Sequence, residues 1–183
     1  MKTVLVPLFE GFEEIEAITI IDVLRRANIK VITASLDTQT VLGAHAIAVI
    51  ADKLLDEILD QVNANHFDAI ILAGGAGTFR MREDARIDSI LKSQFQSNKL
   101  IGAICAAPTV LSQAGLLKGK RATSFPSVKD QLEVGEYLQI PVVVDGNIVT
   151  SRGAGTAMAF ALKLVEILQD EAIANKLASD MIV

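Results

Sequence analysis

The chain has 183 residues, enough for one domain with a sizeable buried core. Hydrophobic residues make up 51% of it and charged residues 21%, with 17 basic residues against 22 acidic ones and a net charge of −5. This acidic balance argues against a protein that binds nucleic acid through a basic surface, and the lack of any apolar run of roughly 18 residues argues against a membrane helix.

The N-terminal stretch MKTVLVPLFEGFEE begins like a secretory signal peptide. Its apolar part ends at Glu10 and no small-residue cleavage site follows, so we interpret it as a first strand and predict a cytoplasmic protein. A single cysteine excludes an internal disulfide, and two histidines with one cysteine offer little for a zinc site. We therefore expect no metal.

Strand-like and helix-like segments alternate along the chain. Short apolar runs with β-branched residues predict strands, and apolar residues at helical spacing predict helices. The expected strands are Thr3–Leu8, Lys30–Leu36, Asp68–Leu72, Leu100–Ile104, Arg121–Ser124, Val142–Val144 and Ile148–Ser151, and the expected helices are Glu14–Ala27, Leu54–Val62, Glu83–Gln96, Ala106–Ala114, Thr156–Leu168 and Glu171–Ser179.

Two further stretches indicate antiparallel turns. Residues 37–50 hold Gly43 between two short β-like pieces, which predicts a hairpin or excursion, and Asp145-Gly146 predicts a tight turn between the last two strands. Strands that alternate with crossover helices predict an α/β fold, with a mostly parallel sheet and helices on both faces, in a single domain over residues 1–183. Sites in such folds lie at the carboxyl ends of the strands, here residues 7–16, 73–77 and 104–108.

The only cysteine, Cys105, stands between a strand-like and a helix-like run in LIGAICAAP. It is either a small core residue, as free cysteines often are, or a thiol held on a sharp turn for chemistry. The strand–turn–helix context favours the reactive thiol. The N–H groups and partial positive charge of a helix N-terminus lower a thiol pKa, and Pro108 suits a first helical turn.

Gly74 and Gly75 end another buried strand, in AGGAG. Glycine allows positive φ and close approach of a ligand, and its N–H groups can stabilise an oxyanion. A lone glycine pair is more often a plain tight turn, and the phosphate-loop patterns are absent here.

The stretch EGFEEIEA places four acids at the start of the first helix. We expect Glu13 and Glu14 to do no more than complement the helix dipole. Glu16 lies between Ile15 and Ala17, and an inward orientation would make it a buried carboxyl able to exchange protons with a thiol. Spacing alone leaves both orientations of Glu16 open.

Neither histidine is expected beside Cys105. His66 precedes the strand that starts at Asp68 and so belongs at the opposite edge of the sheet, and His45 falls in the expected hairpin. We expect both to be ordinary surface or loop residues. A cysteine hydrolase of the usual kind needs a histidine base, so the chemistry is expected to use cysteine and glutamate.

Together these segments resemble the ThiJ/PfpI superfamily, and most closely its DJ-one branch, that of the Parkinson-associated deglycase and its bacterial YajL-type relatives. GFEEIEA resembles the acidic helix start of that branch, AIILAGG its glycine turn and AICAAPTVL its nucleophile elbow. IDVLRRANIKV and VTSRGAGTAMAFAL also match family segments, so the similarity spans nearly the whole chain. The resemblance implies a flavodoxin-like three-layer sandwich.

The resemblance also implies roles for individual residues. Cys105 would be the reactive thiol, Glu16 the carboxyl that touches it, and the backbone N–H groups of Gly75 and Ala106 would polarise a bound oxygen. Residues implied around the substrate or the subunit contact are Gly74, Phe125, Arg152 and Arg26. The family further implies a homodimer that pairs through the first helix, here Glu14–Ala27, and activity without a cofactor.

Two departures from the family pattern bear on activity. Peptidase-type members carry histidine directly after the cysteine, and Ala106 at that position argues against a protease. Phe125 stands where the animal deglycases have a histidine, which is the pattern of the YajL-type members and removes a possible imidazole.

The resulting hypothesis is an enzyme that acts on reactive carbonyls. It would convert methylglyoxal to lactate, or release the early adducts that such aldehydes form with amines and thiols. The alternative is a non-enzymatic redox sensor or stress chaperone that works through oxidation of Cys105. Both hypotheses predict a role in carbonyl or oxidative stress. Under neither is the protein expected to bind a membrane or to bind nucleic acid strongly.

Overall fold

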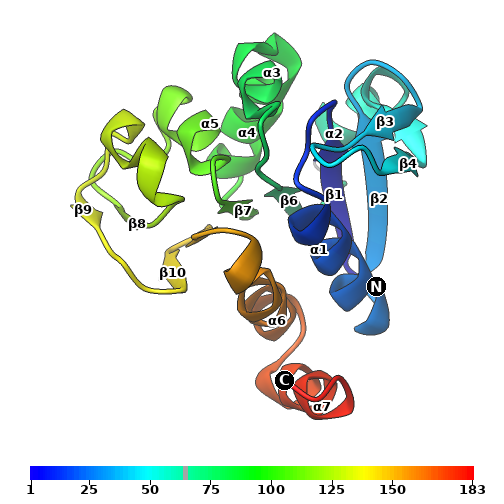
Figure 1. Ribbon diagram of the computed structural model, residues 1–183, viewed down its shortest axis with the longest axis vertical. Helices are drawn as coiled ribbons and strands as arrows, with labels where there is room; N and C mark the ends of the chain where they lie inside the picture. The colour runs from blue at the N-terminus through cyan, green and yellow to red at the C-terminus, as the bar shows by residue number, and fades with distance from the viewer. Residues whose placement is uncertain (64–65) are drawn as a thin grey trace.

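The strands at Ala69–Leu72 and Leu100–Ile104 are buried along their whole length because helices cover both faces of the sheet. A computed structural model (Figure 1) describes residues 1–63 and 66–183. It contains a seven-stranded sheet in the order β10-β11-β7-β6-β1-β2-β5. All neighbouring strands are parallel except the β10–β11 pair. The strands are β1 (Thr3–Leu8), β2 (Lys30–Ser35), β5 (Lys53–Leu54), β6 (Ala69–Leu72), β7 (Leu100–Ile104), β10 (Val142–Asp145) and β11 (Ile148–Ser151).

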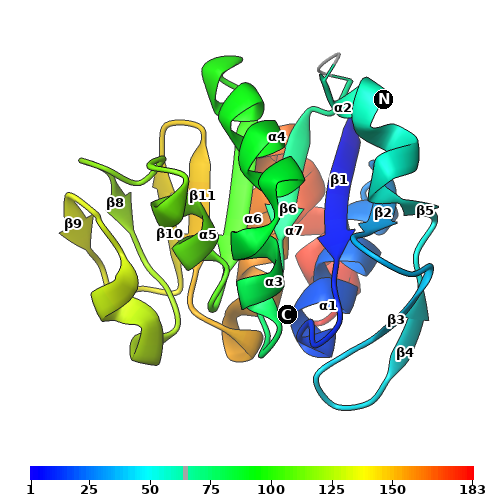
Figure 2. The same ribbon diagram turned by 90° about the horizontal axis from the view of Figure 1, so that it is seen from above.

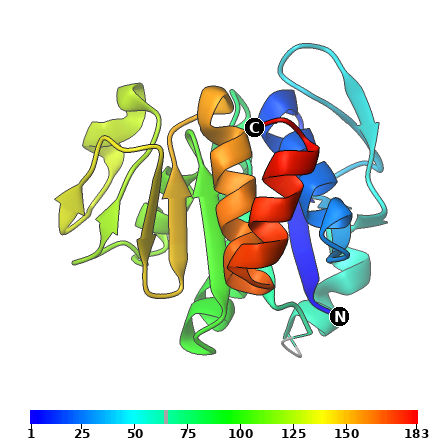
Figure 3. The ribbon, with the colours of Figure 1, turned by 90° about the horizontal axis from the view of Figure 1, so that it is seen from below.

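Two layers of helices enclose this sheet. Figure 2 shows α2 (Leu59–Asn63), α3 (Thr78–Glu83), α4 (Ala85–Gln96) and α5 (Pro108–Gln113) over one face. Figure 3 shows α1 (Glu14–Arg26), α6 (Ala157–Leu168) and α7 (Glu171–Asp180) over the other face. Within the described ranges, no helix has both the length and the apolar character needed to cross a membrane. The predicted α/β class, with helices on both faces of a mostly parallel sheet, is confirmed.

Smaller elements lie at the two ends of the sheet. The expected hairpin is confirmed as the antiparallel pair β3 (Thr40–Leu42) and β4 (Ala48–Ile50). At the other end β8 (Arg121–Ala122) pairs in parallel with β9 (Glu136–Tyr137), so the strand predicted at Arg121–Ser124 is shorter and belongs to a separate sheet. The remaining elements are the short 3-10 helices η1 (Leu55–Ile58), η2 (Pro126–Gln131) and η3 (Ala154–Thr156).

Several predicted helices start later in the structure, and two of these differences change the type of element. The helix predicted at Glu83–Gln96 is divided, because Asp84 leaves the helical conformation and its side chain caps α4 by accepting the Arg86 N–H at 2.8 Å. The helix predicted at Leu54–Val62 begins instead with β5 and η1, because its first residues complete the edge of the main sheet.

The strand order reverses beside β1, which creates the crevice where sites form in such sheets. From β1 the chain passes to β2 on one side, and β6 later pairs on the other side of β1. The loops after β1 and β6 touch there, since the Gly77 N–H donates to the Gly11 carbonyl at 3.0 Å. A Cβ at Gly77 would lie 1.9 Å from the Glu10 carbonyl oxygen, so glycine is required at this contact.

The cap on α4 can be tested by Asp84→Ala. We expect the free energy of unfolding to fall by about 1–2 kcal/mol, because the substitution removes an N-cap and also the Arg86 contact. Urea denaturation followed by circular dichroism measures this change. Asp88→Ala is the control, because it removes an exposed pair with Lys92 and an acidic residue of the same first turn but leaves the cap in place. Equal losses in the two variants would contradict the capping role.

Candidate functional site

Cys105 sits on a strained turn at the carboxyl end of β7. Its φ of +64° lies in the left-handed region, which side chains other than glycine adopt rarely. Its N–H donates to the Ser151 carbonyl at 3.0 Å, and its carbonyl accepts the Phe125 N–H at 2.8 Å. These two hydrogen bonds fix the conformation of the turn. The following helix, α5, starts at Pro108, two residues later than the predicted Ala106. The strand–turn–helix context inferred from the sequence is therefore confirmed.

Glu16 points inward from the first turn of α1, so the inward one of the two orientations left open by its spacing is correct. The residue is fully buried, and its Oε2 accepts the Gly74 N–H at 2.8 Å. Among the described residues, Oε1 has no hydrogen-bond partner of good geometry. The carboxyl lies close enough to the Cys105 thiol for each group to alter the pKa of the other.

Burial makes both groups hard to ionise. It raises the pKa of Glu16 to about 7, against the opposing effects of the Gly74 N–H and the Cys105 thiol. Burial, followed by the charge of Glu16, raises the pKa of Cys105 to about 12, against the opposing effect of the Ala106 N–H. The Ala106 N–H acts in the expected direction, but burial and the charge of Glu16 outweigh it, so the expected net lowering of the thiol pKa is wrong. A thiolate forms more readily when Glu16 carries a proton, because the repulsion between the two charges is then absent.

The two glycines have different roles. The Gly74 N–H is occupied by Glu16, so its predicted role as an oxygen-binding donor is not supported. A Cβ at Gly74 would also lie 2.7 Å from the Cys105 Cβ. Gly75, with φ of +119°, and Ala106 both line the space beside the thiol, and in the described chain the Gly75 N–H bonds to no other residue.

A cavity of about 530 Å³ opens above these groups. Five predicted site residues line it, namely Cys105, Glu16, Gly75, Ala106 and Phe125. No site role was predicted from the sequence for the other lining residues, which are Glu13, Ile15, His45, Ala76, Ser127, Val128 and Ala154.

The two predicted arginines are not in this cavity. Arg152 lines a neighbouring groove together with Phe125 and Gly153. Arg26 lies in the last turn of α1, opposite the end that carries Glu16, and its Nε donates to Asp22 Oδ2 at 2.7 Å.

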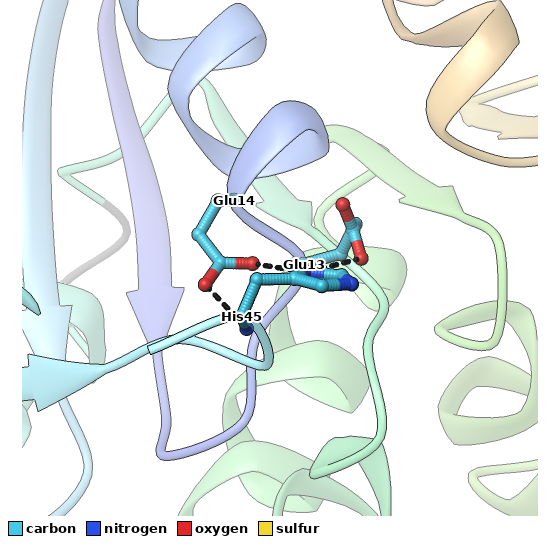
Figure 4. Close-up of side chains that lie close together, drawn as sticks. All are labelled: Glu13, Glu14 and His45. Atoms are coloured by element: carbon cyan, nitrogen blue, oxygen red, sulfur yellow. Dashed lines mark hydrogen bonds and ion pairs between the residues drawn. The ribbon is translucent and has the colours of Figure 1, made fainter. Parts of the chain in front are cut away.

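Glu14 fastens the β3–β4 hairpin to the start of α1. Its buried carboxylate accepts the His45 N–H at 2.6 Å and the Ile47 N–H at 3.4 Å, and Oε2 lies 2.9 Å from His45 Nδ1 (Figure 4). Burial opposes ionisation, but these hydrogen bonds outweigh it and lower the pKa of Glu14 to about 2. The expectation that Glu14 merely complements the helix dipole is therefore wrong.

The hairpin brings the His45 imidazole to the cavity, where the sequence predicted no histidine. The His45 side chain is 69% exposed, and its Nδ1 also lies 3.6 Å from Glu13 Oε2 (Figure 4). The hydrogen bond to Glu14, reinforced by the charge of Glu13, raises the pKa of His45 above its ordinary value. His66, as predicted, precedes β6 at the opposite edge of the sheet.

Comparisons with known proteins give a consistent result. A model described as the DJ-1/PfpI family matches residues 2–167. The chain is 44% identical to protein dj-1beta of Drosophila melanogaster, in an alignment that covers 100% of this chain and 97% of that protein. The crystal structure of Drosophila DJ-1beta superposes with a TM-score of 0.91 at 42% identity, covering 100% of this chain and 98% of that one.

Two further relatives carry names that describe an activity. A glutathione-independent glyoxalase of Caenorhabditis elegans, DJR-1.2, is 39% identical over 92% of this chain and 89% of its own length. A deglycase of Pyrococcus abyssi is 34% identical over 91% of this chain and 99% of its own length. The chain spans only 37% and 41% of the Arabidopsis thaliana DJ-1 homologs B and A, although it is 43% identical to each. The expected closeness to bacterial YajL-type proteins stays a prediction.

The buried carboxyl of Glu16 predicts a pH-dependent stability. Between pH 4.5 and 7 the folded chain keeps a proton that the unfolded chain releases, because the folded pKa is raised. The stabilising contribution of Glu16 is therefore complete below pH 4.5 and is lost as the pH rises through 7. Across this range the free energy of unfolding falls by about 3 kcal/mol. Glu16→Gln lacks this contribution. The stability difference between variant and wild type, measured by urea denaturation, should move in favour of the variant as the pH rises; a pH-independent difference would contradict the raised pKa.

Proposed function

The chain belongs to the DJ-1/PfpI family, and we propose that it is a cofactor-independent cysteine enzyme that converts α-oxoaldehydes such as methylglyoxal to hydroxy acids. The observation that carries this proposal is the pairing of Cys105, on a strained turn, with a buried proton-exchanging carboxyl. The glyoxalase and deglycase names of two relatives support the same class of activity.

The first chemical step joins the thiol to the aldehyde. The Cys105 sulfur, as a thiolate beside protonated Glu16, forms a bond to the aldehyde carbon, and the aldehyde oxygen takes the Glu16 proton. The Gly75 and Ala106 N–H groups are suited to hold this oxygen while it carries negative charge, since both residues line the cavity beside the sulfur. The product is a hemithioacetal, and Glu16 is left as a carboxylate.

The second step moves hydrogen between neighbouring carbons. Glu16 removes the hydrogen of the former aldehyde carbon as a proton and returns it to the adjacent ketone carbon, while the proton on the first oxygen passes to the second. The result is a thioester of lactate, with the aldehyde carbon oxidised and the ketone carbon reduced. Because the electrons move within the substrate, no external oxidant or cofactor is needed.

Hydrolysis completes the cycle. A water molecule gives a proton to the Glu16 carboxylate, its oxygen bonds to the thioester carbon, and Cys105 leaves as a thiolate. The same addition applies when the aldehyde is already bound to a protein amine or thiol, provided that the adduct presents a carbonyl to the sulfur. The cavity, at about 530 Å³, is large enough to admit part of such an adduct.

Conversion of methylglyoxal to lactate by wild type and by Cys105→Ala tests this function. We expect steady lactate formation by the wild type and none above background by the variant, because the variant lacks the nucleophile. Glu16→Gln should reduce kcat by about 100-fold or more, because the amide cannot exchange the carbon-bound proton. Lactate should be measured directly, in metal-free and glutathione-free buffer, because loss of aldehyde alone can report adduct formation.

Two outcomes would contradict the proposal. Lactate formation by Cys105→Ala at the wild-type rate would exclude the thiol as nucleophile. If the wild type forms no lactate while its thiol still reacts with peroxide, the redox-sensor hypothesis replaces the enzyme hypothesis.

A further inference from the structure

The proposed reaction needs two kinds of proton transfer. One proton moves from carbon to carbon, and a second moves from the first substrate oxygen to the other. Glu16 is occupied with the carbon-bound proton, because its carboxyl is buried beside the sulfur that holds that carbon. A different group is therefore needed to carry the oxygen-bound proton.

The described lining of the cavity offers few candidates for this role. Its other titratable side chains are Glu13 on the α1 side and His45 on the hairpin side. The η2 side contributes Phe125, Ser127 and Val128, none of which titrates near neutral pH. Of the two candidates, only His45 has an ordinary pKa near neutrality, which suits a group that must both give and take a proton.

Glu14 makes the hydrogen bonds that hold His45 in place. Glu14 accepts the backbone N–H of His45 at 2.6 Å and lies 2.9 Å from Nδ1. In the described part of the chain, no hydrogen bond occupies Nε2. The imidazole thus has one nitrogen fixed by a charged carboxylate and the other available for proton exchange (Figure 4).

Glu14 does more than a surface ion pair would. Its side chain is buried, and it also accepts the backbone N–H of Ile47 at 3.4 Å. A Cβ at Gly43 would lie 2.3 Å from Glu14 Oε1, so the hairpin turn is shaped around this carboxylate. The contacts fix the backbone that carries the imidazole, and Glu13 Oε2, 3.6 Å from Nδ1, adds a second negative charge that favours the imidazolium.

We propose that His45, positioned by Glu14, is the acid–base group that moves the oxygen-bound proton of the substrate in this cavity. The inference rests on the proposed function. When Glu16 removes the carbon-bound hydrogen, the imidazolium gives its proton to the ketone oxygen, which becomes a hydroxyl. When Glu16 returns the hydrogen to the second carbon, neutral His45 takes the proton of the first oxygen, which becomes the thioester carbonyl. Both groups then regain their starting protonation states.

The first test compares lactate formation by wild type and His45→Gln as a function of pH. Glutamine keeps a donor for the Glu14 carboxylate but cannot titrate. We expect kcat to fall by about 100-fold, and the decline of the wild-type rate at high pH, where His45 loses its proton, to disappear in the variant. His66→Gln is the matched control, because His66 lies at the opposite edge of the sheet, and it should leave the rate and its pH dependence unchanged.

The second test is chemical rescue. His45→Ala with added imidazole should regain at least about 10-fold of the lost rate, because the side chain it replaces is 69% exposed beside an open cavity. A merely structural role would not give rescue, since free imidazole does not restore the hairpin contacts. Added imidazole should not change the rate of His66→Gln.

The outcomes separate the two proposals. If the wild type forms Cys105-dependent lactate while His45→Gln keeps the wild-type rate and its high-pH decline, the assignment of His45 is overturned and the proposed function stands. Loss of activity in His45→Ala without imidazole rescue also overturns it. If the wild type forms no lactate, the proposed function fails and this assignment fails with it.

Discussion

The hydrogen bond from the Gly74 N–H to the buried Glu16 carboxylate joins three parts of the fold. It fixes the first turn of α1 to the turn after β6, and the same carboxyl lies against the thiol at the end of β7. A Cβ at Gly74 would collide with Cys105 Cβ, the Ala106 nitrogen and Glu16 Oε2, the nearest at 2.7 Å. Because Gly74 has no side chain, α1, the turn after β6 and the Cys105 thiol can come into contact.

The position of this contact follows from the topology of the sheet. Strand order reverses beside β1, so the helices that follow β1 and β6 lie on opposite faces of the sheet and a crevice forms at the carboxyl ends of the strands. Close contacts between Gly11 and Gly77 secure the two loops to each other. The crevice is thus open enough for a cavity, yet its walls are held by backbone bonds that do not depend on any ligand.

Burial at this point determines the electrostatics of the site. A carboxyl and a thiol withdrawn from water both resist ionisation, and each further disfavours charge on the other. The pair is therefore suited to sharing a proton, with thiolate favoured when the carboxyl is neutral. At the rim of the cavity, charge is favoured instead. Glu14 stays ionised because it accepts hydrogen bonds from His45 and Ile47, and its negative charge stabilises a positive charge on His45.

The sequence by itself determined the alternation of strands and helices, the hairpins, and three of the strand ends that form the site. These features depend on local periodicity and on turn residues such as the Gly74–Gly75 pair, which act over a few neighbours. The exact start of α4 was missed, because Asp84 can either continue a helix or cap one and only packing decides between them.

Only the tertiary structure decided which side chains meet. Glu16 and Gly74 are 58 residues apart, and Glu14 and His45 are 31 residues apart, so no periodic pattern links either pair. The same limit explains the wrong direction predicted for the Cys105 pKa. The helix N-terminus beside the thiol is a local feature, whereas the burial and the carboxylate that outweigh it exist only once distant segments have packed together.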